Sequence, residues 1–106
     1  MSENITTAPV IILDAQDCKF SPGQVVCTRG ALAAMQEHEI SPSSLLRRHI
    51  SGDWVNVPVE DAQLNDLSLK NDGRLLSSYD IAQGVRIWLI TEWDRSVTTY
   101  LLPSEY

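Results

Sequence analysis

The sequence is poor in the residues that several function classes require. Among 106 residues it has two cysteines, two histidines and eight basic side chains against fourteen acidic ones. Cys18 and Cys27 match no zinc-binding spacing, and His38 and His49 are not placed to complete such a site. We therefore expect two reduced thiols, no bound metal and no other cofactor.

The deficit of positive charge argues against nucleic acid as a partner. The formal net charge is −6, whereas nucleic-acid-binding proteins gain much of their affinity by neutralising phosphates with Lys and Arg. An acidic surface fits a protein partner better, although solubility alone also explains such a charge. No apolar run approaches the roughly 20 residues that cross a bilayer. The start, MSENITTAPVIIL, carries an acid where a secretory signal has positive charge. The expected location is the cytoplasm, without membrane contact.

Established catalytic motifs are missing from the sequence as well. It has no G-x-G-x-x-G, no phosphate-binding P-loop, no G-x-S-x-G and no EF-hand loop. Its carboxylates are scattered and not paired, so metal and glycosidase chemistry lack an anchor. These absences favour a protein that is not an enzyme.

The sequence does contain the pattern of one mixed domain. Residues 1–8 are polar and predict a loose N-terminal tail, and residues 9–106 are predicted to form a single α+β domain. The apolar run PVIILDA, over 9–15, is typical both of a short strand and of an arm that pads a core. A proline-glycine turn then leads into QVVCT, over 24–28, which predicts a strand.

Two short helices should follow this strand. Thr28 can cap a helix over 29–39. Ser41, followed by proline, is the expected N-cap of a second helix that runs to residue 51, and Gly52 is the expected residue after its end.

A third helix is predicted over 58–72. Acidic residues in its first turn suit the helix dipole, and Gly73 is expected to end it. Leu64 and Leu67 lie three positions apart, so we expect them to face the core together, and Trp54 in the preceding link should also pack there.

The last third of the chain changes to a period of two. Strands are predicted over 74–81, 85–93 and 96–103, joined by the short turns AQG and DR. Neither face of the middle strand is wholly polar, which indicates a central strand covered on both sides. The predicted fold class is therefore α+β: an N-terminal strand, about three short helices, then a three-stranded antiparallel meander forming one sheet.

The hairpin sequence TEWDRSVTT has the highest density of polar side chains. Trp and Arg are frequent anchors of protein interfaces, so the candidate binding residues are Trp88, Trp93, Asp94, Arg95 and Thr98. Turn formation also explains Asp94 and Arg95, and strand propensity explains Thr98. His49 lies beside the apolar side of its helix, where core packing explains it better than catalysis.

A catalytic alternative uses some of the same residues. Arg74, Tyr79, Glu92 and Arg95, with Tyr100 nearby, would supply a base, a cation and a phenol on one sheet face. Metal-independent ribonucleases use such groups to move protons and stabilise phosphate charge.

The motifs GDW and GRLLSSY, an ND in the third helix and above all GVRIWLITEWDRSVTTYLLPSEY resemble a family of small bacterial proteins carried on plasmids, phages and integrated elements. The resemblance covers residues 20–106 and makes the first twenty residues an extension of this chain. Some members are labelled subunits of type I restriction–modification systems, but this sequence has no N-P-P-[FY] motif and is too short for a methyltransferase. The matching positions are Gly52, Asp53, Trp54, Asn65, Arg74, Ser77, Tyr79, Trp88, Thr91, Glu92, Asp94, Arg95, Ser96, Thr98 and Thr99.

The resemblance implies a mobile-element accessory protein of unknown activity, and it assigns no catalytic role to any of these residues. The main hypothesis is a non-enzymatic, acidic protein-binding domain whose partner is a host defence or plasmid-maintenance factor. An exposed edge strand would also permit a homodimer. The alternative is a small ribonuclease or toxin-like enzyme, because the order of the elements is similar to that of barnase-like, colicin and RelE-like ribonucleases.

Overall fold

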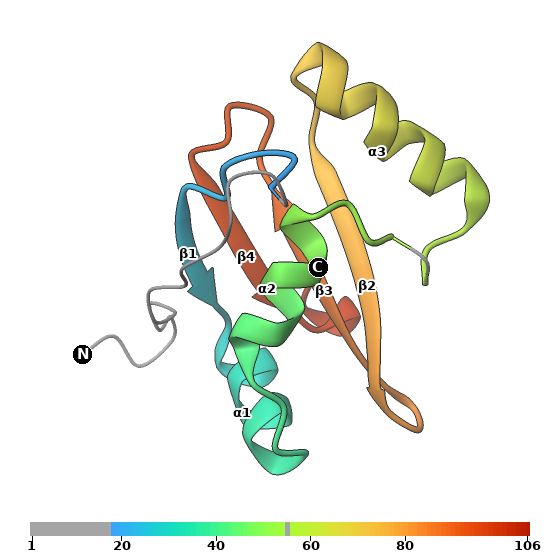
Figure 1. Cartoon of the computed structure of the whole chain (residues 1–106). Coiled ribbons are helices and arrows are strands. Elements are labelled where there is room, and N and C mark those ends of the chain that lie inside the picture. The colour runs from blue at the N-terminus through green and yellow to red at the C-terminus, as the bar shows by residue number, and fades with distance from the viewer. Residues whose placement is uncertain (1–17, 55) are drawn as a thin grey trace.

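The computed structural model describes residues 18–54 and 56–106, and its elements follow the order expected from the sequence (Figure 1). The predicted tail over 1–8 and the apolar run over 9–15 lie outside the described residues. The α+β class is confirmed. The elements are β1 (Gln24–Cys27), α1 (Arg29–Glu37), α2 (Pro42–Ile50), α3 (Val59–Asn71), β2 (Leu75–Ala82), β3 (Val85–Thr91), β4 (Val97–Leu101) and a 3-10 turn (Pro103–Glu105).

The sheet has four strands in the order β1-β4-β3-β2, and it is mixed. The predicted three-stranded antiparallel meander is confirmed, but the expectation that it makes up the whole sheet is wrong. β2, β3 and β4 form the antiparallel meander, while β1 lies beside β4 in parallel. At the two ends of this pair, Gln24 N–H donates to Ser96 O and Thr28 N–H donates to Tyr100 O, each at 3.0 Å. Parallel strands need a long crossover, which here contains all three helices and two strands, so no local pattern in the sequence predicts the pairing.

Short polar residues and glycine set the limits of the first two helices. The Thr28 side chain accepts a hydrogen bond from the Ala31 N–H at 3.1 Å, which confirms it as the cap of α1. Ser41 occupies the N-cap position of α2, although its side chain makes no capping bond there. Gly52 follows the end of α2 with a φ of 86°, a conformation that favours glycine.

The third helix differs from its prediction in which side faces the domain. Leu64 and Leu67 are 58% and 55% exposed, so the expectation that they face the core is wrong. At the C-terminal end of the helix, Asp72 and not Gly73 takes the left-handed conformation, with a φ of 56°. The side chains that α3 packs against the domain are Ala62, Asn65 and Leu69, which lie three and four positions apart, while the exposed Asp66 reaches the indole of Trp54.

One of the three packed residues of α3, Asn65, is polar, and the two leucines beside it are exposed, which explains why the apolar period of the helix is weak. Asn65 is only 3% exposed. Its side-chain amide donates to Leu76 O at 2.7 Å and its carbonyl accepts from Leu76 N–H at 3.0 Å. Asp66 accepts from the indole N–H of Trp54 at 3.2 Å, and Trp54 is buried against this helix as expected. Asn65 thus pairs with part of the exposed edge of β2 as a neighbouring strand would.

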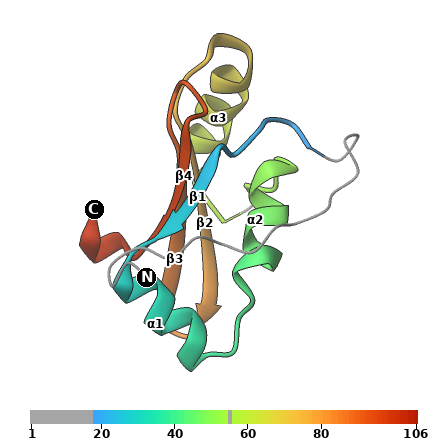
Figure 2. The same ribbon diagram turned by 90° about the vertical axis from the view of Figure 1, so that its left-hand side faces the viewer.

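The two faces of the sheet are covered very differently. Figure 2 shows α2 on one side of the strands and the C-terminal turn on the other. On the helical side, the main core packs Met35 of α1 and Leu46 of α2 against alternate residues of the strands. These strand residues include Tyr79, Leu89 and Tyr100. β3 is internal, as predicted. Helices cover one of its faces, and on the other the C-terminal segment contacts it, which leaves Ile90 buried and Trp88 half-buried.

Candidate functional site

A chain of buried hydroxyl groups crosses the helical side of the sheet. His49 on α2 is fully buried, with its Nδ1 2.6 Å from Ser77 Oγ and its Nε2 2.8 Å from Thr91 Oγ1. Thr91 Oγ1 lies 2.6 Å from Thr98 Oγ1, and the Thr98 hydroxyl donates to Pro22 O at 2.7 Å. The chain therefore joins α2 to three strands and to the turn before β1.

The last bond fixes the direction of all the others. The single proton of Thr98 points to a carbonyl, so Thr98 must accept from Thr91, and Thr91 must accept from the imidazole. A neutral His49 that carries its proton on Nε2 then accepts at Nδ1 from Ser77. Every atom of the chain is satisfied in this one arrangement. Burial, together with the charge of Arg95, lowers the pKa of His49 from 6.5 to about 3, so the ring stays neutral in the folded protein.

A serine next to a histidine is also the arrangement of a nucleophile and its base. Here both side chains are 0% exposed, and the hydroxyl of Ser77 is needed as the donor to His49. A substrate could not reach the pair without opening the core. The arrangement therefore fixes the packing of α2 on the sheet, and we assign it a structural role.

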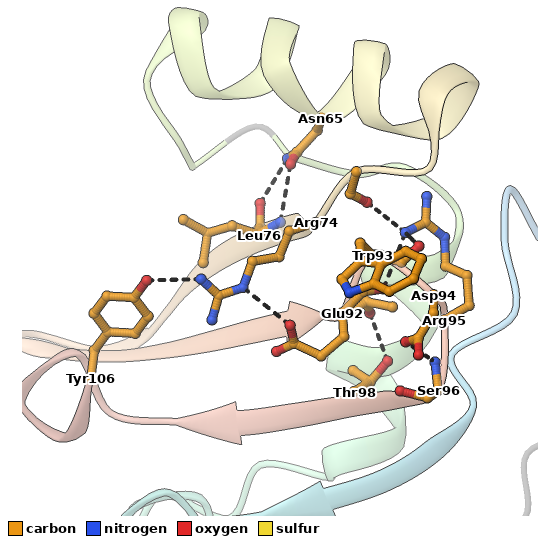
Figure 3. Close-up of polar contacts among 12 residues, drawn as sticks. Asn65, Arg74, Leu76, Glu92, Trp93, Asp94, Arg95, Ser96, Thr98 and Tyr106 are labelled. Carbon is orange, nitrogen blue, oxygen red and sulfur yellow. Dashed lines mark hydrogen bonds and ion pairs between the residues drawn. The ribbon is translucent and has the colours of Figure 1, made fainter.

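The predicted binding residue Arg95 is also used by the fold. Its guanidinium donates to four backbone carbonyls: Gly73 at 2.5 Å, Ser68 at 2.9 Å, and Glu92 and Trp93 at 3.2 Å each (Figure 3). These bonds join the β3–β4 turn to the C-terminal end of α3, where a cation suits the helix dipole. The guanidinium is thus committed within the domain.

The other residues of the hairpin lie in unlike surroundings. Trp93 is 63% exposed at the turn, and Thr98 is fully buried, so Thr98 cannot touch a partner in this fold. Hydrogen bonds from Ser96, its hydroxyl first and then its backbone N–H at 3.1 Å, hold the pKa of Asp94 below its usual range. Asp94 therefore serves the turn, as its sequence context predicts.

We call the side of the sheet opposite the helices the open face. It carries Trp88, the last of the predicted binding residues. The fold places on it the outward residues of β2, β3 and β4, together with the C-terminal tyrosine that lies above them; they include Leu76, Ser78, Trp88, Ile90, Thr99, Leu101 and Tyr106. Trp88 is half-buried there, in edge contact with the Tyr106 ring at 5.6 Å between centroids. Ser78, its cross-strand neighbour, is 4% exposed, and its hydroxyl has no hydrogen-bond partner among the described residues.

Two adjacent hollows lie on the open face. The first, about 220 Å³, is lined by Arg74, Leu76, Trp88, Ile90 and Tyr106. Arg74 spans its rim, because it donates to Tyr106 Oη at 2.9 Å and its Nε lies 3.6 Å from the carboxylate of Glu92 (Figure 3).

The second hollow, about 250 Å³, shares three of these residues with the first and lies beyond Arg74. It is more polar than the first because Glu92, Thr99 and Glu105 help to line it, with Leu101. The open face therefore has an apolar hollow beside an acidic one.

The four residues of the ribonuclease alternative are not brought together. Arg74 and Glu92 pair on the open face. Tyr79 is 0% exposed on the helical side, where its hydroxyl donates to Asp53 O at 2.6 Å and burial raises its pKa to about 12. Arg95 is held by the carbonyls described above. Tyr100 likewise donates from the core to Pro42 O at 2.6 Å, and burial raises its pKa. The set does not form one catalytic centre.

Comparisons with protein-family models, curated proteins and solved structures found no match to this chain. Within 18–54 and 56–106, no three His, Cys, Asp or Glu side chains gather as metal ligands would. In the same part of the chain, no helix has the length and apolar character needed to cross a bilayer. The open face, with its two adjacent hollows, is therefore the candidate functional site.

Proposed function

We propose that this chain is a protein-interaction domain and that the open face of its sheet binds the partner. The observation that carries the proposal is the apolar hollow beside Trp88, on a sheet face over which, among residues 18–54 and 56–106, a short C-terminal segment lies and no helix of the domain packs. Apolar sheet faces in small domains are normally packed fully against another layer, whereas Leu76 and Trp88 on this face stay half-buried beside the hollow.

The composition of the face supports the same function. Trp, Tyr and Arg are the residue types that contribute most to protein interfaces, and here Trp88, Tyr106 and Arg74 meet around one hollow. Leu64 and Leu67 on α3 are also exposed, but neither of them lines the hollow beside Trp88.

The resemblance to mobile-element proteins supports an accessory role in the cytoplasm, with a host defence or plasmid-maintenance factor as the partner. The net charge of −6 favours a protein partner over a nucleic-acid partner.

Affinity capture with two matched variants tests the proposal. Trp88→Ala removes a wall of the hollow, while Trp93→Ala removes a more exposed tryptophan from the turn outside it. We expect a host protein to be retained by the wild type and by Trp93→Ala, and to be lost with folded Trp88→Ala. Retention that depends on Trp93 and is indifferent to Trp88 would place the interface at the turn and overturn the proposal.

A further inference from the structure

The size of the first hollow determines what can enter it. At about 220 Å³ it is smaller than the roughly 300–1,000 Å³ of small-molecule sites, but it can hold one bulky side chain. Its walls are aromatic and aliphatic, and its one charged group, Arg74, is turned toward Tyr106 and Glu92. The hollow therefore favours an apolar anchor residue.

The second hollow offers one carboxylate that is free to bind a further group. Glu105 Oε1 already accepts from the Thr28 hydroxyl at 2.6 Å and from the Leu102 N–H at 2.8 Å, so this side chain is held in place. Glu92 is different: its side chain is 38% exposed, and among the described residues it forms one ion pair, with Arg74, through Oε1 at 3.6 Å. Its other carboxylate oxygen has no partner in the described part of the chain, so it can accept from an added cation.

The overall charge favours the same kind of occupant. A chain with a net charge of −6 attracts a basic segment, and this raises the rate of association. A second copy of this chain carries the same net charge of −6, so the same electrostatics oppose self-association.

Resting on the proposed function, we propose that the partner presents a large apolar side chain followed within a few residues by Lys or Arg. The apolar side chain fills the hollow beside Trp88, and the cation binds the carboxylate of Glu92. The two hollows adjoin at Arg74, so one short segment can reach both.

A random peptide library displayed on phage, selected on the immobilised full chain, tests this inference. We expect the enriched peptides to combine an aromatic or leucine residue with Lys or Arg. The affinity of a selected peptide should fall about tenfold or more with Trp88→Ala. Glu92→Gln removes only the charge and should weaken the same peptide about two- to fivefold, the range for one exposed ion pair. An apolar peptide without a cation is the matched control, and it should bind the wild type and Glu92→Gln with equal affinity.

Leu76→Lys is a second variant in case Trp88→Ala does not fold, because it places a cation at the hollow and leaves Trp88 intact. This variant should weaken the binding of the basic peptides. Enrichment of acidic or uncharged peptides that still require Trp88 would overturn the basic partner and support the open face as a binding site. Selected peptides that bind Trp88→Ala and Leu76→Lys as tightly as the wild type would overturn this inference. The proposed function is tested separately, by the capture of a host protein.

Discussion

Replacing Ser77 by alanine tests the hydrogen-bond chain through His49 most sharply. The hydroxyl of Ser77 is the donor to Nδ1 of His49, both side chains are fully buried, and the two atoms lie 2.6 Å apart. The substitution leaves the ring nitrogen without a partner in the core, and such a group costs about 1–3 kcal/mol. A domain of this size is stable by about 5–15 kcal/mol, so the loss is readily measured.

The neighbouring Ser78 is a matched control for that experiment. It is 4% exposed, close to Ser77 in burial, but its hydroxyl has no partner among the described residues. Ser78→Ala should therefore be neutral or stabilising, because it removes a buried group that is already unpaired. Urea unfolding followed by circular dichroism gives both free energies. The proposed directions of the hydrogen bonds through His49 would be refuted if Ser77→Ala lost no more stability than Ser78→Ala.

Three further predictions concern the pH dependence and the two other polar contacts that hold the elements together. The folded His49 has a lowered pKa of about 3 against 6.5 when unfolded, so its contribution is full above pH 6.5 and is lost as pH falls below it. At pH 5 the loss is about 2 kcal/mol, and the wild type should lose that much more than His49→Gln between pH 7 and 5; equal losses would contradict the neutral ring. Arg95→Gln should cost about 2–3 kcal/mol in urea unfolding, because the guanidinium donates to four carbonyls; a loss under 0.5 kcal/mol, as at ordinary surface sites, would show that these bonds contribute little. Asn65→Asp keeps the acceptor for Leu76 N–H but loses the donor to Leu76 O, so we expect a loss of about 1–3 kcal/mol and faster amide exchange along β2; unchanged exchange would contradict the edge pairing.

Much of the local structure could be predicted from the sequence because its causes are local. Thr28 and Gly52 mark helix ends through their own backbone and side-chain preferences. The alternating pattern of the last third gives the meander, since side chains of a strand point to opposite faces. These signals need only a few neighbouring residues.

The remaining features depend on contacts between distant residues. β1 pairs with β4 across about seventy residues, and no periodicity encodes that choice. The inward side of α3 was misassigned to Leu64 and Leu67 because Asn65 serves as a pairing partner for β2, so a polar residue occupies a buried position.

Of the residues that line the candidate site, Trp88 was predicted as a binding residue, and Arg74 and Glu92 were predicted only as part of the ribonuclease alternative. Trp88 was identified as a binding residue because of its type, but the hollow beside it also needs Leu76 from β2 and Tyr106 from the C-terminal segment. Arg95 has the residue type of an interface anchor, yet it binds carbonyls of its own chain. Residue type alone cannot distinguish these two uses of an arginine.

The most direct test of the open face is photo-cross-linking in the native host. A photoreactive phenylalanine analogue replaces Leu76, which lines the hollow, and in a matched variant it replaces Leu64, which is exposed on the outer side of α3. We predict a cross-link to one host protein from position 76 and none from position 64. Cross-linking from position 64 alone, or only between copies of this chain, would contradict the assignment of the open face as the partner-binding surface.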